Sequence, residues 1–396
     1  MRAKAIVVFM FLLFSVSSGL AGTEKVLYTF TGGLDGGQPY QAGVIFDQSG
    51  NLYGVTQYGG VYGEGTVFQL TPSPDGTWTE TVLYNFIGAP DGAQPQAGLS
   101  IDGAGNLYGT ASVEGPGSCG TVFELSPSES GWTYTILHAF TGGKDDGCIP
   151  LADLLLLDGV IYGTTIGGCA NQGAVFQIRS GYNIGCFKGN AEMIPLGLGE
   201  CATGICGNTF YGVKGCGSLF WLPGGVYPSN LHAFKYGGKF GCCPTGDLAF
   251  SWSDWSTYGT TSELGVGRSA GVVYRFVLNR RQTGYVFSVL HSFNNGTDGG
   301  GPWAGVILDA AGNLYGTTQW AGTPEGGGAG TVFKLTPGLN KHNKVIWNFT
   351  TLYSFTGGAD GGNVTSPVVL DNAGNVYGTT TSGGAYNQGV VYEVTP

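Results

Sequence analysis

Acidic residues recur in glycine-rich segments of this chain, with aromatic residues close by. The segments "GGLDGGQPYQAG", "GAPDGAQPQAG", "NNGTDGGGPWAG" and "GGADGGNVTSP" each carry one aspartate. Carboxylates beside exposed aromatic faces suit sugar binding, and glycosidases use paired carboxyl groups in catalysis. The candidate ligand-binding residues are Asp35, Tyr40, Tyr58, Asp91, Asp298, Trp303, Trp320 and Asp360. The competing interpretation is that these are solvated turn aspartates and aromatic residues that cover strand ends.

Histidine, the usual general base, is scarce: the chain has four. Three of them, His138, His232 and His291, replace a tyrosine of a repeated strand, so we expect packing and hydrogen bonding there. No Ser-His-Asp arrangement and no metal-binding histidine spacing is present. The sequence therefore predicts no catalytic residue, no metal site and no cofactor.

All nine cysteines lie between Cys119 and Cys243. In a secreted protein such cysteines indicate disulfide bonds. The candidates are Cys119, Cys148, Cys169, Cys201, Cys206, Cys216, Cys242 and Cys243. Cys201 and Cys206 flank a short hairpin and could pair with each other, which would leave Cys186 or another cysteine unpaired. A metal or thiol-redox site is the alternative, but no Cys-x-x-Cys motif supports it, and the connectivity stays open.

The elements that must position these residues form a repeat of about 55 residues. A Tyr-Gly phrase such as "NLYGT" occurs seven times and is followed each time by a phrase such as "GTVF". The tyrosines are Tyr53, Tyr108, Tyr162, Tyr211, Tyr258, Tyr315 and Tyr377. In "DQSGN" and related turns before them, Asp47 and its equivalents accept backbone N–H groups, and Gly50 and its equivalents supply a positive φ. These turns lack the dense oxygen ligands of a calcium loop.

Two further strands complete each repeat. One alternates apolar and polar residues, as in "VLYNF", and the other is a short apolar run such as "AGVIF". Four short strands with glycine-rich turns and no amphipathic helix are typical of one blade of a β-propeller. An open β-solenoid is the alternative.

The two ends of the chain favour a closed ring. The last repeat supplies three strands, and the missing fourth is "VLYTF" at residues 26–30. Pairing of this strand into the last blade would leave no open edge. We therefore predict an all-β, seven-bladed β-propeller of four-stranded blades, closed by the N-terminal strand.

The first residues have the pattern of a secretory signal peptide. Arg2 and Lys4 precede an apolar run, and Gly19 and Ala21 fit a cleavage site. An uncleaved membrane anchor is the alternative, although the run is shorter than the roughly 20 residues of a span. We expect residues 1–21 to be the signal peptide and residues 22–396 to be one propeller domain without a membrane span, secreted to the periplasm or the exterior.

Charge narrows the class of partner. The formal charge of the chain is −10, and removal of Arg2 and Lys4 with the signal peptide makes it −12. Without clustered lysine and arginine, nucleic acid and anionic membranes are poor partners. The simplest explanation of the acidic net charge is that it keeps the protein soluble.

The pattern "LYSFTGGADGG...VVLDNAGNVYGTTTSGGAYNQGVVYEVTP" resembles the GloVer repeat of bacterial choice-of-anchor tandem repeat proteins, over nearly all of the mature chain. The third to fifth repeats drift from it, with "CATGICGNTFYG" and "SWSDWSTYGTT". The resemblance implies a secreted or surface-exposed bacterial protein without an established activity. No sorting signal is seen after Pro396, which departs from the family name.

The sequence favours a noncatalytic, monomeric binding module that presents one loop face to a glycan or an extracellular protein. The alternative is a carbohydrate-active enzyme, a glycoside hydrolase or polysaccharide lyase, that uses loop aspartates at the mouth of the central channel. We expect Tyr40 and Trp303 near this mouth, and Tyr58 and Trp320 farther out. A purely structural envelope role is a third possibility. Facing carboxylates in a pocket at the ring centre would keep the enzyme alternative open.

Overall fold

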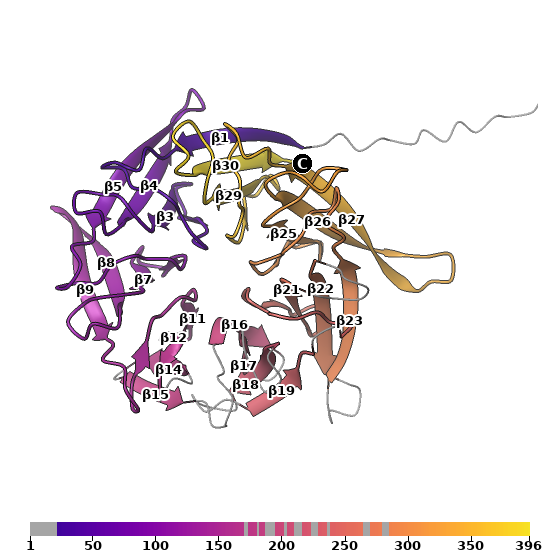
Figure 1. Cartoon of the computed structure of the whole chain (residues 1–396), viewed down its shortest axis with the longest axis horizontal. Helices are drawn as coiled ribbons and strands as arrows, with labels where there is room; N and C mark the ends of the chain where they lie inside the picture. Colours follow the sequence, from indigo (N-terminus) through magenta and orange to yellow (C-terminus); the bar gives the residue numbers. More distant parts are fainter. Residues whose placement is uncertain are drawn as a thin grey trace, which may run out of the picture.

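The computed structural model describes residues 22–169, 173–179, 182–186, 195–201, 204–209, 216–222, 229–235, 238–263, 270–278 and 285–396. These residues form β-strands and connecting turns, with no helix among them. The strands pair into antiparallel four-stranded sheets, and Figure 1 shows these sheets arranged around a central axis. The prediction of an all-β propeller is confirmed.

The first sheets follow the chain from the centre outwards. One contains β2 (Ile45–Phe46), β3 (Leu52–Thr56), β4 (Thr66–Pro72) and β5 (Trp78–Asn85). The next contains β6 (Ser100–Ile101), β7 (Leu107–Ala111), β8 (Thr121–Ser128) and β9 (Gly131–Ala139). A third contains β11 (Leu155–Leu157), β12 (Val160–Thr165), β14 (Ala174–Ile178) and β15 (Tyr182–Cys186), beside a two-stranded ribbon of β10 (Gly147–Cys148) and β13 (Gly167–Gly168).

The later sheets repeat the same order. They contain β16 (Pro195–Cys201), β17 (Gly204–Thr209), β18 (Ser218–Leu222) and β19 (Ser229–Ala233), then β20 (Ala249–Ser251), β21 (Ser256–Thr261), β22 (Val272–Leu278) and β23 (Tyr285–Ser292). Next come β24 (Ile307–Leu308), β25 (Leu314–Thr318), β26 (Thr331–Leu339) and β27 (Val345–Ser354). The last sheet contains β28 (Val369–Leu370), β29 (Val376–Thr380) and β30 (Val390–Thr395), with β1 (Thr23–Thr29) beside β30.

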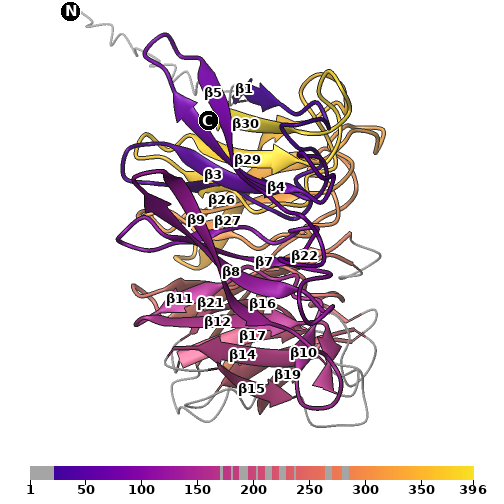
Figure 2. The same cartoon turned by 90° about the vertical axis from the view of Figure 1, so that its left-hand side faces the viewer.

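The start and the end of the described chain lie side by side. Strand β1 runs antiparallel to β30, with Thr23 opposite Thr395 and Thr29 opposite Val390. Figures 1 and 2 both show β1 along the outer edge of this last sheet. The N-terminal strand thus occupies the outermost position that β5, β9 and β27 occupy in their own sheets.

The Tyr-Gly phrase and the following aromatic phrase occur in register because one packs on the other. Gly54 lies opposite Phe68 in the β3–β4 pair, and a Cβ atom on Gly54 would lie 2.6 Å from the Phe68 ring. Gly109 and Phe123 repeat this arrangement, also at 2.6 Å. Both phenylalanines are fully buried. Only glycine leaves room for the ring, so the two phrases must vary together.

The hydrophobic core lies between neighbouring sheets. One cluster joins Leu27 and Phe30 at the N-terminus with Phe68 and Leu70 of β4 and with Val391 of β30. The Phe30 and Phe68 rings meet edge to face at 5.1 Å between centroids. Because each sheet buries its two faces against its neighbours, a sheet that loses a strand destabilises the adjacent sheets as well.

The repeated turns are structural, as predicted. Asp47 Oδ1 accepts the backbone N–H groups of Ser49 and Asn51 at 2.8 and 2.9 Å, and Asp47 Oδ2 accepts the Asn51 amide and the Tyr53 hydroxyl. Gly50 has a φ of 85°. Burial is the largest single effect on the pKa of the Asp47 carboxyl and raises it, but these hydrogen bonds together outweigh burial and hold the pKa below its usual value.

Candidate functional site

One face of the propeller collects the loops predicted to bind a ligand. Isolated bridges join Gly37 to Tyr58 and Gly300 to Trp320, so the loop entering a sheet pairs with the loop between its second and third strands. Tyr58 is 40% exposed and Trp320 is 38% exposed. The Trp320 indole donates a hydrogen bond to Asn295 Oδ1 at 2.8 Å. We call this side the loop face.

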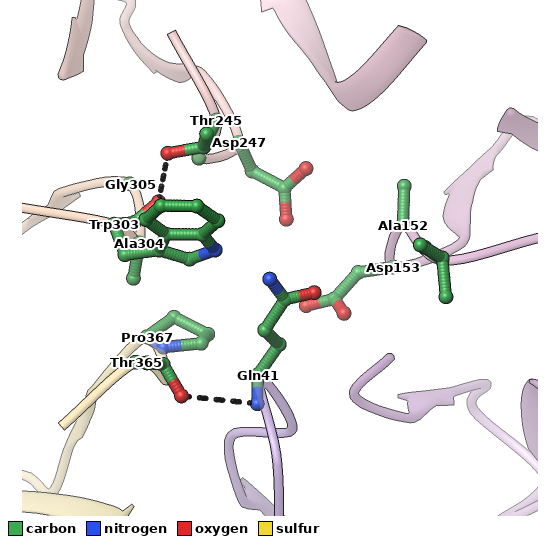
Figure 3. Close-up of a pocket in the computed structure, with 12 residues that line it drawn as sticks. Gln41, Ala152, Asp153, Thr245, Asp247, Trp303, Ala304, Gly305, Thr365 and Pro367 are labelled. Carbon is green, nitrogen blue, oxygen red and sulfur yellow. Dashed lines mark hydrogen bonds between the residues drawn. The ribbon is translucent and has the colours of Figure 1, made fainter. Parts of the chain in front are cut away.

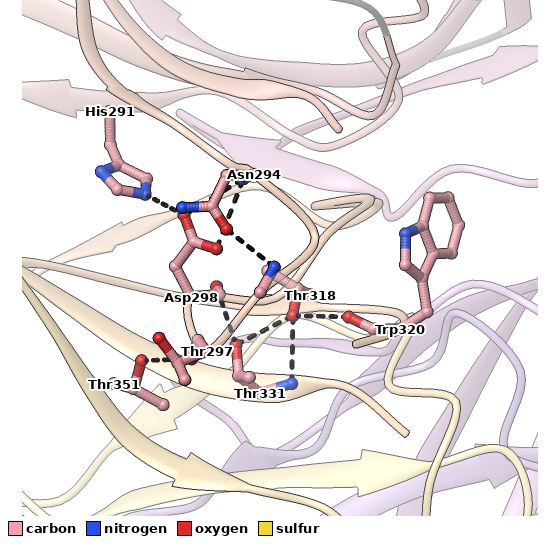
Figure 4. A network of polar contacts seen from close by, with 9 residues as sticks. His291, Asn294, Thr297, Asp298, Thr318, Trp320, Thr331 and Thr351 are labelled. Atoms are coloured by element: carbon pink, nitrogen blue, oxygen red, sulfur yellow. Dashed lines mark hydrogen bonds and ion pairs between the residues drawn. The ribbon is translucent and has the colours of Figure 1, made fainter. Parts of the chain in front are cut away.

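The aspartates of the loop face brace their own loops. Figure 4 shows Asp298, which is 6% exposed, with its carboxylate 3.1 Å from His291 Nε2 and accepting the backbone N–H of Asn294. Its backbone carbonyl accepts the hydroxyl of Thr331, which also contacts Thr318 at 2.8 Å. This network fixes the loop on the outer strand from which it emerges.

The same arrangement recurs around the ring. In each case the carboxylate contacts the tyrosine or histidine of the outer strand and accepts a backbone N–H just after that strand. The sets are Tyr28–Asp35–Thr31, Tyr84–Asp91–Ile87, His138–Asp146–Thr141 and Tyr353–Asp360–Thr356. Asp91 is only 5% exposed. Ligand contact by Asp35, Asp91, Asp298 and Asp360 stays a prediction, whereas their bracing role is a direct observation.

Two glutamates on outer strands lie close to these aspartates, and one carboxyl oxygen of each is buried without a hydrogen-bond partner among the described residues. These oxygens are Glu24 Oε1 and Glu80 Oε1. Burial, and secondly the charge of Asp360, raises the pKa of Glu24 to about 7, and burial with Asp35 does the same for Glu80. Tyr134 takes the equivalent position in the next sheet and stacks on Tyr84 at 4.2 Å.

These shifts predict a fall in stability between about pH 4.5 and pH 7. A folded-state pKa above the unfolded value means that the stabilising contribution is complete below pH 4.5 and is lost as the pH rises through 7. The Glu24→Gln, Glu80→Gln variant should match the wild type near pH 4.5 and exceed it at pH 8 by about 1 kcal/mol per site, after allowance for solvent screening. Urea unfolding at both pH values measures this. Glu129→Gln removes an exposed carboxylate as the control, and an equal gain from it would contradict the assignment.

Polar side chains from several sheets converge at the ring centre (Figure 3). Asp153 and Asp247 precede the innermost strands β11 and β20, and both carboxyl groups point into one small pocket. The Trp303 indole and the Gln41 side chain face the same pocket. The pocket has a volume of about 40 Å³, which suits a water molecule or one hydroxyl group.

Loops of neighbouring sheets hold this pocket in place. The Thr245 hydroxyl donates to the Trp303 carbonyl, and the Gln41 N–H donates to Thr365 Oγ1 at 3.2 Å. Asp153 Oδ1 accepts the backbone N–H of Gly98 at 2.5 Å. Since β6 has no strand on its inner side, this carboxylate satisfies a donor at the edge of the sheet.

A wider channel continues from the pocket along the innermost strands. Its volume is about 400 Å³, and Asp153 and Asp247 line both cavities. The remaining lining comes from the first strands, including Ile45, Phe250 and Leu308. The channel therefore extends away from the loop face, towards the hairpins that join first and second strands, and the two carboxyl groups lie at its narrow end.

The environment sets Asp153 apart from an ordinary carboxyl group. Burial raises the pKa of the Asp153 carboxyl to about 6, against the opposing effects of the Gly98 N–H and of a hydrogen bond with Asp247. A protonated acid can donate a hydrogen bond, and an ionised one can only accept. The pair can thus present both functions to a ligand in mildly acidic solution.

We did not predict Asp153 and Asp247 as site residues, although the sequence contains a simple signal for them. Gly43, Gly98 and Gly305 hold the same repeat position, which Asp153 and Asp247 occupy in "ADLLLL" and "GDLAFS". A carboxylate that replaces glycine at a position facing the axis indicates a candidate site residue. Trp303 lines the pocket, and its contact with a ligand stays a prediction.

The predicted placement of Tyr40 at the channel mouth is shifted by one residue. The loop "QPYQAG" is one residue longer than "QPQAG" and "GPWAG", so Gln41 occupies the repeat position of Trp303 and lines the pocket. Tyr40 lies beside it, partly buried, and burial raises the pKa of its hydroxyl. Its role in ligand binding stays a prediction.

The disulfides link the loop face of neighbouring sheets. Cys119 pairs with Cys148, and Cys216 pairs with Cys242. Cys169 is also disulfide-bonded. The prediction that Cys243 is a disulfide candidate is wrong: it is a buried free thiol whose Sγ lies 3.5 Å from Cys242 Sγ, because Cys242 already holds the available partner. The suggested Cys201–Cys206 pair and Cys186 have side chains outside the described residues.

Comparison with known proteins settles the family. The model of the Gloeobacter/Verrucomicrobia repeat matches residues 12–189 and again residues 203–396. The chain belongs to the Gloeobacter/Verrucomicrobia repeat family. The resemblance seen in the repeated phrases is thereby confirmed. No curated protein matches the sequence.

Solved structures resemble this member of the repeat family in fold. A Bacteroides uniformis protein described as a 6-phosphogluconolactonase has a TM-score of 0.51 at 12% identity, with 85% of this chain and 89% of that chain covered. The periplasmic gluconolactonase of Pseudomonas aeruginosa has a TM-score of 0.50 at 14% identity, over 82% and 85%. The β-propeller domain of Cps50 from Myceliophteria thermophila scores 0.49 at 8% identity, over 94% and 100%. At identities this low, the two lactonase structures support the fold alone.

The described residues contain no group of three or more His, Cys, Asp or Glu side chains placed to hold a metal ion. No helix among these residues has the length and the apolar character needed to cross a membrane.

Proposed function

We propose that the mature protein, residues 22–396, is a secreted, monomeric binding module that recognises a glycan at the loop-face end of its central channel. One observation carries this proposal: the carboxyl groups of Asp153 and Asp247, the Gln41 side chain and the Trp303 indole face one pocket from different sheets. Carboxylates and amides hydrogen-bond sugar hydroxyls, and an indole packs against the apolar face of a sugar ring. The acidic net charge of the mature protein, −12 after loss of Arg2 and Lys4 from the −10 of the whole chain, argues against polyanionic ligands.

The architecture that we propose around this site is a seven-bladed ring closed by the N-terminal strand. Its support is the sheet order β28-β29-β30-β1, together with seven Tyr-Gly phrases in the sequence. Closure would hold the innermost strands at fixed distances and so pre-form the pocket. We also propose that residues 1–21 are a cleaved signal peptide, with which the disulfide bonds are compatible.

A glycan array and titration calorimetry test the binding function. Asp247→Asn and Trp303→Ala should each weaken binding of the best array ligand by about 10-fold, since each removes one direct contact. The far-UV spectrum and melting temperature control for folding. Rim residues Tyr58 and Trp320 supply a comparison: Tyr58→Ala should have a smaller effect than Trp303→Ala. Unchanged affinity in both central variants would refute the proposal.

A carbohydrate-active enzyme is the second candidate, favoured by the raised pKa of Asp153 beside Asp247. Burial raises the pKa of the Asp153 carboxyl, and a glycosidase needs such a protonated general acid with a second carboxyl group nearby. Release of new reducing ends or of unsaturated products from polysaccharides, lost in Asp153→Asn, would establish this function. Binding without turnover would support the module.

A further inference from the structure

Two exposed tryptophans stand on a hairpin at the other end of the channel. The turn between β20 and β21 contains Trp252 and Trp255, which are 66% and 53% exposed. Their rings meet edge to face at 5.8 Å between centroids. Exposed tryptophans in such a pair bury little surface in the protein itself, so packing does not explain them.

The sequence of this turn departs from its repeats in a specific way. Ser251 takes the position of Asp47, the turn is one residue longer, and Trp255 takes the position of Gly50 when counted back from the tyrosine. Trp255 has a φ of 55°, in the left-handed region where Gly50, Gly105, Gly312 and Gly374 lie in the equivalent turns. A bulky residue is rarely found there, because its Cβ crowds the backbone. The hairpin thus retains an unfavourable residue that its own relatives in the chain avoid, and such outliers concentrate at functional positions.

The two indoles continue into the channel. Phe250, which lines the channel, contacts Trp252 edge to face at 4.9 Å and Trp255 at 6.2 Å. The three rings therefore form a continuous aromatic surface from the exposed turn to the channel wall. We call Trp252 and Trp255 the hairpin platform.

The polar groups beside the hairpin platform offer hydrogen bonds and little net charge. Arg275 Nη2 lies 2.9 Å from Asp254 Oδ2, and Arg275 Nε donates to Ser256 Oγ at 2.7 Å. Ser251 and Ser253 place their hydroxyl groups 2.9 Å apart on the same turn. The charge of Asp254 is neutralised by Arg275, so the surroundings favour a neutral partner over a cation or an anion.

We propose that the hairpin platform binds a neutral polysaccharide, with pyranose rings packed on the faces of Trp252 and Trp255 and their hydroxyls hydrogen-bonded to Asp254 and the two serines. The axial C–H groups of a sugar ring are apolar and match the electron-rich face of an indole. The platform exposes roughly 300 Å² of aromatic surface, judged from the usual area of tryptophan side chains. A stable protein partner needs about 800 Å² per side, so one or two sugar rings fit this area better.

This proposal does not depend on the function proposed for the loop face. Hairpins between first and second strands lie on the opposite side of the propeller from the loops that carry Trp303 and Trp320. The two proposals can therefore fail separately, and variants of one face serve as controls for the other.

A double variant tests this proposal. Trp252→Ser with Trp255→Gly removes both exposed indoles and places glycine at the position with positive φ, so this variant should fold about as stably as the wild type. Hexasaccharides of β-1,4-glucan, β-1,4-mannan and α-1,4-glucan are the probes, measured by calorimetry and by tryptophan fluorescence. We expect at least one of them to bind the wild type, and the double variant to lose about 100-fold in affinity, or about 10-fold per indole. Tyr386→Ala, which removes an exposed aromatic ring outside both proposed sites, should bind that probe normally.

Three results would overturn the proposal. No binding of any of these probes to the wild type is one, and equal binding to the double variant is another. The third is a wild type that self-associates in light scattering without sugar and becomes monomeric in the double variant, since the platform would then be a contact between two copies of this chain. Loss of binding in Trp303→Ala with normal binding in the double variant would instead support the loop-face site.

Discussion

A chain that begins at Gly32 should fail to fold cooperatively. It lacks β1, and with it the strand that covers the edge of β30 from Val390 to Thr395. It also loses Phe30, which is fully buried and packs on Phe68. Loss of one buried phenylalanine costs about 3–5 kcal/mol, and the uncovered β30 edge adds exposed backbone groups. Together these losses approach the whole stability of about 5–15 kcal/mol that a domain possesses.

The expected product is an aggregating species that binds a hydrophobic dye and unfolds without a sharp transition. Circular dichroism during heating and size-exclusion chromatography measure this. A circular permutant provides the control: residues 22–31 are moved behind Pro396 through a short Gly-Ser linker, which is feasible because Thr23 lies opposite Thr395. The permutant should melt within about 5 °C of the unpermuted chain. A truncated chain with native-like melting would show that β1 is dispensable and that the ring is not closed by it.

The strands of this propeller were predictable because the same packing requirement recurs in each repeat. The Tyr-Gly phrase must precede an aromatic residue, since Gly54 leaves the space that the Phe68 ring fills. One such pair is a weak signal, but copies in register exclude chance. The position of the N-terminal strand beside β30 followed from the three-stranded last repeat.

The bracing role of the loop aspartates was also present in the sequence, although we predicted ligand contacts for them. Asp35, Asp91, Asp298 and Asp360 each follow the tyrosine or histidine of the outer strand by seven residues. A constant spacing between a hydrogen-bond donor and a carboxylate indicates a local contact. The repetition therefore favours a structural role of these aspartates over a ligand-binding role.

The central pocket was hidden because it depends on differences between repeats. Asp153 and Asp247 belong to the third and fifth repeats, which drift from the consensus, and each is a single substitution of glycine. Which loop residue faces the axis also depends on loop length, as Gln41 shows by taking the place expected for its neighbour. Pairwise distances across a ring cannot be derived from one repeat, so the convergence of these side chains required the structure.

The second large effect that we expect is a loss of folding stability when either disulfide on the loop face is removed. Cys119–Cys148 and Cys216–Cys242 close segments with sequence separations of 29 and 26 residues. Loss of such a crosslink frees the unfolded chain and costs about 3–4 kcal/mol per bond in the chain-entropy model. Cys119→Ser with Cys148→Ser, and Cys216→Ser alone, should therefore each lower the free energy of unfolding in urea by that amount. A loss below about 1 kcal/mol would show that strain in the folded state offsets the crosslink.

Because of Cys243, we expect Cys216→Ser and Cys242→Ser to differ in how much stability they lose. Its backbone N–H donates to the Cys216 carbonyl at 3.0 Å, and its Sγ lies 3.5 Å from Cys242 Sγ. In the folded wild type, burial and Glu263 raise the pKa of the Cys243 thiol to about 12, so little thiolate is present to attack the disulfide at neutral pH. During oxidative folding of Cys242→Ser no such restraint exists, and Cys243 can pair with Cys216. Cys242→Ser should thus keep a bond at Cys216, found by peptide mapping, and lose less stability than Cys216→Ser; equal losses with an unpaired Cys216 would contradict this exchange.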